Sequence, residues 1–396
     1  MTRRAVIASS VLSSLIAALL LFVTAVPTGR YLARAAWEEA KILSHRQWID
    51  RLVADPALDP RTRGKLSLVL ETRRFAHDSL GMRTGESFTT FTSVPRDTLV
   101  LVVSAAYRDR LERYTWWFPI IGRVPYKGFF DFAAARSLVR DLERQGYDAY
   151  ARPASAFSTL GWFNDPLLST SLRADSVDLA GTVIHELTHT TFYASGQAVF
   201  NESFAEFVGA RGSARFFRAR GDSVSASRAE HRWADEKVLA DFYHAVYASL
   251  DSAFRSHTDS RPARLLARDT VFARARALFA ISVWPRLSMS SGRPPPTLRL
   301  DNAIVLARRV YATDLELFDV VYRAEGGDVS RSVRRVIALA TAHPAQPFRA
   351  VAEWLQAERS SLPGEDGLYV DQWLARHPPS GPRALSRLTA EASSQK

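Results

Sequence analysis

Two histidines, His185 and His189, flank Glu186 in the sequence His-Glu-Leu-Thr-His. Apolar residues recur around them at helical spacing, so we expect this segment to be a helix. Residues four apart lie on one face of a helix, and both imidazoles can therefore reach one metal ion from the same side. Glu186 lies one step around the helix, where its carboxylate could serve as a base without occupying a ligand position. The pattern is typical of a catalytic zinc site.

A zinc ion held by two histidines needs at least one more protein ligand and an open position for water. Gly196 allows the chain to reverse after the first helix, and a second helix is predicted to begin in Asn-Glu-Ser-Phe-Ala-Glu. We predict Glu202 as the third ligand, with Glu206 as the main alternative. If Glu206 is not a ligand, it could accept a hydrogen bond from a ligating imidazole and orient it, or it could simply belong to a solvated helix face.

The composition excludes several other kinds of site. The chain of 396 residues contains no cysteine, which rules out disulfides, cysteine ligands to zinc, a thiol nucleophile and a lipid attached to an N-terminal cysteine. Its 47% hydrophobic and 23% charged residues are typical of a globular protein. The formal net charge is +11, but the basic residues are almost all arginines scattered through helix-like segments. Because they form no stripe or recognition motif, we expect no nucleic-acid partner.

Residues 1–29 predict a membrane anchor or a signal segment. Arg3 and Arg4 precede an apolar run at residues 5–26, about the twenty residues that a helix needs to cross a bilayer. Positive residues before such a run favour a cytoplasmic N-terminus with the rest of the chain exported. Residues 23–25 also fit a small-residue cleavage site of a removable signal peptide. We expect either a membrane-anchored protein with its catalytic domain on the periplasmic side, or a protein secreted to the periplasm.

The remaining pattern predicts a single α+β domain at residues 30–376. Helical spacing dominates residues 30–97, and β-branched apolar runs in residues 98–175 predict a small mixed sheet. Within that stretch, residues 132–144 predict a helix that stops at Gly146. Residues 176–215 contain the two candidate active-site helices, and residues 216–376 are mainly helical. Residues 377–396 are rich in Pro, Ser and Arg without periodicity, and we expect a disordered tail.

The two glutamate-containing segments resemble the gluzincin class of zinc metallopeptidases, in which His-Glu-x-x-His on one helix is completed by a glutamate of the next. The chain is more similar to a bacterial family described as "putative aminopeptidases", whose members carry an N-terminal membrane or lipoprotein signal. Residues 116–130, 156–170 and 183–209 carry this resemblance, which runs from about Tyr31 to about Val333. It implies a zincin-like catalytic unit and zinc-dependent hydrolysis of peptide bonds, with peptides as substrates.

Further candidate residues follow from the need to align a substrate and to stabilise an oxyanion. Trp162 lies in Ser-Thr-Leu-Gly-Trp-Phe-Asn-Asp-Pro, which could align substrate above the metal by analogy with the edge strand of zincins, or could simply pack in the core. Tyr311, Tyr243 and His231 are candidate donors to the oxyanion. Most tyrosines at helical spacing are core residues, so packing remains the alternative for these too.

The expected mechanism is attack of zinc-activated water on the scissile carbonyl, with Glu186 passing a proton from the water to the leaving amine. Two alternatives remain open. The chain could be a membrane-tethered scaffold whose zinc is structural or whose catalysis is lost, although a closed structural site has no use for a base at Glu186. It could also be a zinc hydrolase that acts on something other than peptides.

Overall fold

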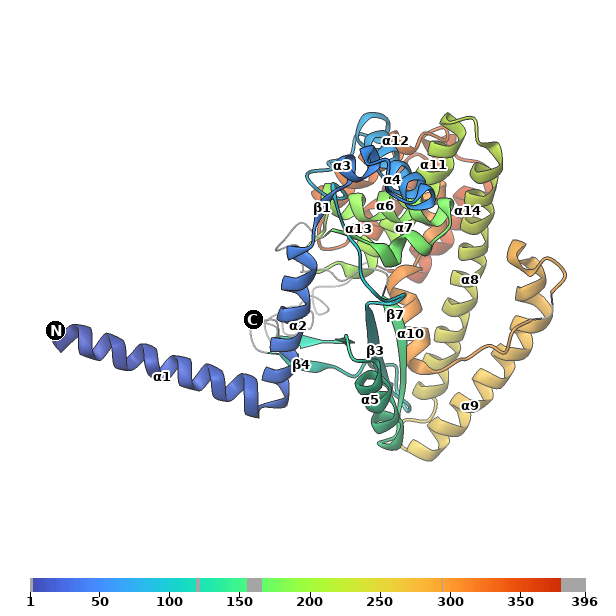
Figure 1. Cartoon of the computed structure of the whole chain (residues 1–396). Helices are drawn as coiled ribbons and strands as arrows, with labels where there is room; N and C mark the ends of the chain where they lie inside the picture. Colours follow the sequence, from blue (N-terminus) through green and yellow to red (C-terminus); the bar gives the residue numbers. More distant parts are fainter. Residues whose placement is uncertain (1–2, 119–121, 155–165, 294, 379–396) are drawn as a thin grey trace.

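The structure is a computed structural model that describes residues 3–118, 122–154, 166–293 and 295–378 (Figure 1). Trp162 and the residues around it lie outside the described residues. The predicted tail lies outside them as well, from residue 379 onward.

The protein is mostly helical and contains small sheets, which confirms the α+β prediction at that level. The helices are α1 (Arg3–Ala25), α2 (Pro27–Ser44), α3 (Ile49–Ala54), α4 (Pro60–Leu80), α5 (Phe132–Arg144), α6 (Ser176–Thr191), α7 (Ala198–Ala219), α8 (Ser223–Arg255), α9 (Arg261–Leu278), α10 (Asn302–Tyr311), α11 (Leu315–Ala324), α12 (Val329–Ala342), α13 (Pro347–Ala357) and α14 (Gly364–Arg376). The strands are β1 (Gln47–Trp48), β2 (Thr90–Thr92), β3 (Val100–Tyr107), β4 (Trp116–Phe118), β5 (Gly122–Val124), β6 (Tyr126–Phe129), β7 (Tyr147–Ala154) and β8 (Leu167–Leu168).

The apolar N-terminal run forms α1, which Figure 1 shows extending away from the rest of the protein. Among the described residues, no helix combines the length and the apolar character that crossing a membrane requires. The predicted membrane span is therefore not supported by the structure.

The three antiparallel strands β6, β3 and β7 form a sheet between two helices, with β3 in the centre. Successive residues of a strand point to opposite faces, so the two faces of β3 have different partners. Val103 and Ala105 pack with residues of α5, whereas Ala106 packs on the opposite face with Ala303 and Leu306 of α10. The sheet thus fixes α10, whose C-terminal end faces the helical part of the protein (Figure 1).

A second sheet is built from shorter strands, and the last of them, β8, lies just before α6 in the chain. Its strands are ordered β1-β2-β8, with β1 and β2 antiparallel and β2 and β8 parallel, so this sheet is mixed, although only β8 lies within residues 98–175, where a mixed sheet was predicted. A helical turn at Ser169–Arg173 joins β8 to α6. The sequence indicated only helix in residues 30–97, because strands of two or three residues such as β1 and β2 are too short to show a period.

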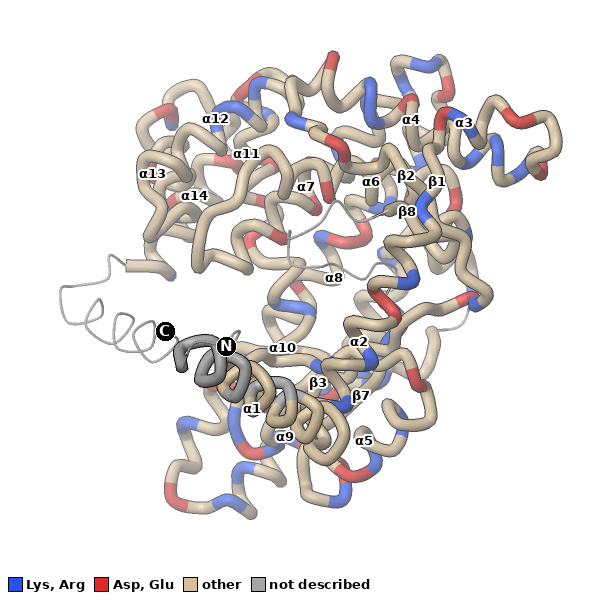
Figure 2. The backbone as a smooth tube through the Cα atoms, turned by 60° about the vertical axis from the view of Figure 1, so that its left-hand side comes forward, with Lys and Arg blue, Asp and Glu red and all other residues tan. Residues whose placement is uncertain are grey.

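The largest hydrophobic core surrounds α6 and α7 and includes residues of α4 and of α11 to α14. Phe204 and Phe207 of α7 both pack against Phe318 of α11, with ring centroids 5.7 Å apart in each pair. These rings are almost completely buried. Figure 2 shows Lys and Arg positions interspersed with Asp and Glu positions over this helical part of the protein.

Candidate metal centre

Helix α6 carries the His-Glu-Leu-Thr-His sequence and begins at a strong cap. The carboxylate of Asp175 accepts hydrogen bonds from the backbone N–H groups of Val177 and Asp178, which have no partner within the helix. Ile184 and Leu187 are fully buried. Because one side of α6 is anchored in the core in this way, the histidines and Glu186 are presented on its other sides.

The turn between α6 and α7 is held by Asn201, whose role the sequence analysis missed. Gly196 has a φ of +74°, a left-handed conformation that glycine adopts without strain. The Asn201 side chain accepts a hydrogen bond from the N–H of Ala194 at 2.9 Å and donates one to the carbonyl of the same residue at 2.8 Å. In the sequence, the signal for this role of Asn201 is its position directly before Glu202.

The two helices approach each other at a pair of glycines. A Cβ atom added to Gly209 of α7 would lie 2.8 Å from the carbonyl oxygen of Gly181 and 3.3 Å from Cβ of His185. No side chain other than hydrogen fits at this position without movement of the backbone. The close approach brings the first turns of α7 over the histidine face of α6. Gly181 and Gly209 are the sequence signal for this approach, because glycine allows backbones to lie close together.

Three of the predicted residues meet in the structure. His185 Nε2 lies 3.2 Å from His189 Nε2 and 3.5 Å from Oε2 of Glu202, and His189 Nε2 lies 3.6 Å from Oε1 of the same carboxylate. Among the described residues, they form the one group of three such side chains whose ligand atoms all lie within 4.8 Å of one another. Two imidazole nitrogens and a carboxylate oxygen in this arrangement could hold a metal ion.

The protonation of the cluster is set by competition between burial and contact. Burial lowers the pKa of His185, but its hydrogen bond with Glu202 and the charges of Glu206 and Glu186 outweigh this, so the pKa is raised overall. Burial raises the pKa of Glu202, but the contacts with His185 and His189 outweigh burial and lower the pKa to about 2. Glu202 is therefore ionised at neutral pH, which is the charge state in which a carboxylate binds a cation.

Glu186 differs from the other carboxylates of the site. It is exposed, and no hydrogen bond or ion pair from a described residue holds its carboxylate. It lies next to His185 in the chain but outside the group of candidate ligands. An exposed carboxylate of this kind can contact a water molecule or a substrate beside it.

Glu206 lies behind the cluster, on the Nδ1 side of His185. Its Oε1 is 3.7 Å from that nitrogen, which is an ion-pair distance and longer than a hydrogen bond. The side chain keeps 40% of its surface exposed, yet the surrounding protein still desolvates the carboxylate and raises its pKa. Arg308 acts in the opposite direction on Glu206 and forms an ion pair of 3.1 Å with Glu236. Glu206 thus lies among charged side chains and is also partly exposed to solvent.

The candidate oxyanion donors lie in different environments. Tyr311 ends α10 and is 37% exposed, and its pKa is raised by burial and then by the negative charge of Glu202, so it lies within electrostatic range of the cluster. Tyr243 is buried in a separate hydrophobic cluster under Arg308, whose guanidinium lies 5.3 Å from its ring centroid. His231 is exposed on α8 and has no described contact with the cluster. Of the three, the structure brings only Tyr311 toward the site.

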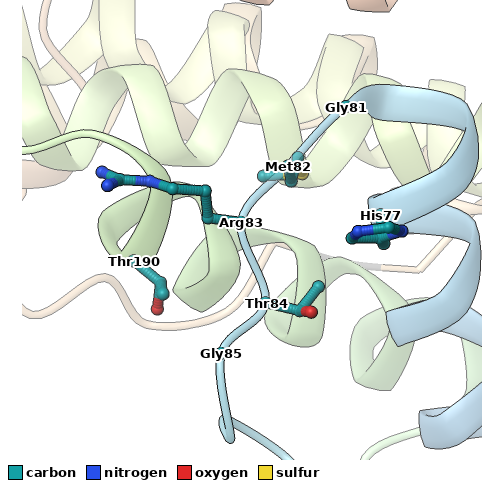
Figure 3. A pocket seen from close by; sticks show the side chains of 7 residues that line it. All are labelled: His77, Gly81, Met82, Arg83, Thr84, Gly85 and Thr190. Atoms are coloured by element: carbon teal, nitrogen blue, oxygen red, sulfur yellow. The ribbon is translucent and has the colours of Figure 1, made fainter.

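A cavity of about 620 Å³ opens beside the last turn of α6 (Figure 3). It is lined by His77, Gly81, Met82, Arg83, Thr84, Gly85 and Thr190. Figure 3 shows that all of these except Thr190 come from the end of α4 and the loop after it. None of the candidate ligands lines the cavity, so the cavity is separate from the group formed by His185, His189 and Glu202.

The protein thus combines a mostly helical α+β fold with a cluster of two histidines and one glutamate on two consecutive helices. Residues 30–351 match the model of the family described as "Putative aminopeptidase", and the chain belongs to this family. The comparison with curated proteins gives no match. The comparison with solved structures gives none either.

Proposed function

We propose that this protein is a zinc-dependent peptidase of the gluzincin type with a zincin-like catalytic unit, and that it acts as an aminopeptidase on peptide substrates. The observation that carries the proposal is the convergence of His185, His189 and Glu202 beside the unpaired carboxylate of Glu186. Membership of the family described as "Putative aminopeptidase" supports peptide hydrolysis as the reaction.

The spacing of the three ligand atoms fits zinc. Ligand atoms at about 2.1 Å from a tetrahedral ion lie about 3.4 Å from one another. The three separations among the Nε2 atoms of His185 and His189 and the nearest oxygens of Glu202 are 3.2, 3.5 and 3.6 Å. Two histidines and one glutamate are also a ligand set of catalytic zinc sites, which leave a fourth position open.

Zinc bound here would polarise the scissile carbonyl and lower the pKa of a water molecule toward about 7. Glu186 would act as the base that accepts a proton from the attacking water and returns it to the leaving amine, and its carboxylate is exposed and held by no described partner. Glu206 orients the ring of His185 through Nδ1, which leaves Nε2 directed toward the cluster. Tyr311 is the donor that we assign to the developing oxyanion.

The substitution Glu186→Gln tests this division of roles. We expect the variant to retain one zinc per chain and the thermal stability of the parent, while hydrolysis falls by about 10²–10⁴-fold. Mass spectrometry measures the zinc content and a peptidase assay measures the rate of hydrolysis, both on the same preparation. A parent protein without bound zinc, or a variant with unchanged hydrolysis, would contradict the proposal, and unchanged hydrolysis would favour a scaffold whose zinc is structural.

Matched peptides distinguish aminopeptidase action from other hydrolysis. We expect aminoacyl substrates and short peptides with a free N-terminus to be hydrolysed, and the same peptides with an acetylated N-terminus to be resistant. Cleavage of internally quenched, N-blocked peptides would instead indicate endopeptidase action. Inactivity of the zinc-loaded protein toward both kinds of peptide would point to a hydrolase of another substrate class.

We also propose that the N-terminal segment exports the catalytic domain to the periplasmic side, as an anchor or as a cleaved signal. The support is the sequence alone, in which Arg3 and Arg4 precede the apolar run. Fractionation of cells that produce the full chain, followed by N-terminal sequencing, tests this. Recovery of the intact protein from the cytoplasm would contradict it.

A further inference from the structure

Three arginines near the C-terminal end of α10 have no acidic partner among the described residues. The nearby Arg108 and Arg268 pair with Asp148, and Arg308 pairs with Glu236. Arg113, Arg152 and Arg309, which we call the arginine cluster, form no ion pair with any carboxylate in the part of the chain that the structure describes. Guanidinium groups that gather in one place without a carboxylate partner suggest that an external anion binds there.

The arginine cluster lies on the α10 face of the sheet. Arg152 pairs with Val102 across the β3–β7 ladder and is two residues from Tyr150, so both side chains share the face that packs on α10. Arg113 follows β3 and donates a hydrogen bond of 2.9 Å from Nη2 to the carbonyl oxygen of Leu306 in α10. Sheet and helix thus hold the first two members of the cluster on neighbouring surfaces.

Tyrosines connect the members of the cluster. Arg152 forms side-chain hydrogen bonds with Tyr150 and Tyr311. The guanidinium of Arg309 lies 3.8 Å from the ring centroid of Tyr247. Arg113 interacts electrostatically with Arg309 and with these same tyrosines. The three cations and the tyrosine hydroxyl groups therefore gather in one region, where both kinds of group can donate hydrogen bonds to an anion.

This region adjoins the candidate metal centre. Helix α10 ends at Tyr311. Just after it, the N–H of Thr313 donates a hydrogen bond of 3.1 Å to Oγ of Ser203, the residue that follows Glu202. Tyr311 is within electrostatic range of Glu202 and is hydrogen-bonded to Arg152. A peptide held at the metal centre can therefore reach the arginine cluster with a neighbouring part of its chain.

A half-buried cation without a counter-ion is unfavourable, and a bound anion relieves it. Arg113 is in this position, because it is half-buried and the strongest charge effect on its guanidinium comes from the positive charge of Arg309. We propose that Arg113, Arg152 and Arg309 bind a carboxylate group of the substrate and so make the site selective for short or acidic peptides. This inference rests on the proposed function, since it assigns a substrate class to the same site.

Two pairs of peptides test the inference and identify the source of the carboxylate. The first pair is one tripeptide with a free C-terminus and with a C-terminal amide. The second is a C-terminally amidated peptide that contains Asp or Asn at one position. We expect kcat/KM to favour the carboxylate of at least one pair by about tenfold to a hundredfold, as hydrogen bonds to charged groups do. Equal rates within both pairs would overturn the inference and leave the peptidase function standing.

Variants show whether the arginine cluster causes the preference. Arg152 is exposed, so Arg152→Gln leaves the core intact. We expect this variant to bring the ratio of kcat/KM between the carboxylate peptide and its uncharged partner close to one, mainly by raising KM for the carboxylate peptide. Arg309→Gln should reduce the preference as well. Arg136→Gln is the matched control, because Arg136 is exposed on α5, across the sheet from α10, and its loss changes the net charge equally. A preference that survives in Arg152→Gln and Arg309→Gln, or that falls equally in the control, would refute the inference.

Binding of the same peptides separates this inference from the proposed function. Calorimetry on the full-length Glu186→Gln protein measures affinity without hydrolysis. If the parent does not hydrolyse peptides but the carboxylate peptide binds more tightly than its amide, and Arg152→Gln removes the difference, the arginine cluster binds carboxylates and the peptidase proposal fails. Equal or absent binding of both members of each pair would overturn the inference.

Discussion

Gly209 of α7 lies so close to Gly181 of α6 that a Cβ at Gly209 would be 2.8 Å from the Gly181 carbonyl oxygen. The relationship is not symmetrical, since a Cβ at Gly181 would meet the Gly209 carbonyl oxygen at an ordinary 3.8 Å. One glycine of the pair is therefore required by packing and the other is not. Because Glu202 and His185 lie on these two helices, the spacing of the helices determines whether the candidate ligands can meet.

Gly209→Ala should separate the two helices and weaken metal binding. The added methyl group has backbone atoms and Cβ of His185 as neighbours, so α7 must shift, and overpacking of this kind costs about 1–3 kcal/mol. Gly181→Ala gains the same helix propensity without a clash and is the matched control. Thermal unfolding and zinc titration of both variants measure the effect. Equal behaviour of the two variants would show that the close contact does not set the geometry of the site.

Asn201→Ala should destabilise the turn that returns α7 to α6. Asn201 is 2% exposed, and its loss leaves the N–H of Ala194 without its partner, whereas the carbonyl of Ala194 keeps a hydrogen bond from the N–H of Gln197. A buried backbone group without a partner costs about 1–3 kcal/mol. Asn201→Asp keeps the acceptor and loses the donor, so it should fall between the parent and the alanine variant in urea unfolding. Gln197→Ala, which removes a half-buried side chain of the same turn and its hydrogen bond to the carbonyl of Ala345, should be closer to the parent.

Local features of the fold could be predicted from the sequence because they depend on residues close in the chain. Helix α5 begins and ends at the predicted residues, since Asp131 caps its first turn and Gly146 adopts a φ of +86° after its end. The pairing of His185 with His189 follows from helix geometry alone. The approach of Glu202 needed only a chain reversal at Gly196 in addition.

Contacts between distant segments could not be predicted in this way. Nothing near Arg308 in the sequence indicates that its helix carries it to Glu236 and to the surroundings of Glu206. The periodic pattern also continues through residues 301–324, whereas the structure breaks it between α10 and α11, where Asp314 has a φ of +52°. This break places Tyr311 at a helix end near the metal centre. Tertiary packing, which a single sequence does not show, decides both features.

Removal of metal should lower the stability of the parent but not of a variant without ligands. A metal that binds only the folded state stabilises it by about 2.7 kcal/mol at a concentration of 100 times Kd. We therefore expect chelator to lower Tm of the parent and added zinc to restore it, whereas the Tm of His189→Ala should respond to neither. Glu206→Gln should keep the response with about 10–100-fold weaker affinity, because it perturbs only the orientation of His185. A parent whose Tm ignores chelator and zinc would contradict the metal centre.

Asp175→Asn should destabilise the protein in a pH-dependent way. Hydrogen bonds from Arg232 hold the pKa of Asp175 well below its usual range, and the cap contacts with Val177 and Asp178 lower it further. Since the folded-state pKa is depressed, the stabilisation is complete above the unfolded-state value of about 3.9 and is lost as the pH falls below it. Water screens the pair because the carboxylate is 38% exposed, so we expect a loss of about 1 kcal/mol or less at pH 7.

The measurement is the free energy of unfolding in urea for the parent and Asp175→Asn at pH 7 and below pH 4. The gap between them should narrow in acid and also in 1 M salt, because both treatments remove the charge interaction with Arg232 while asparagine still caps the helix. Asp59→Asn is the control, since Asp59 caps α4 through Thr62 and forms no described ion pair with an arginine. A gap that stays constant with pH would show that Asp175 stabilises α6 through its hydrogen bonds alone, and its charge would then have no part in fixing the helix that carries His185 and His189.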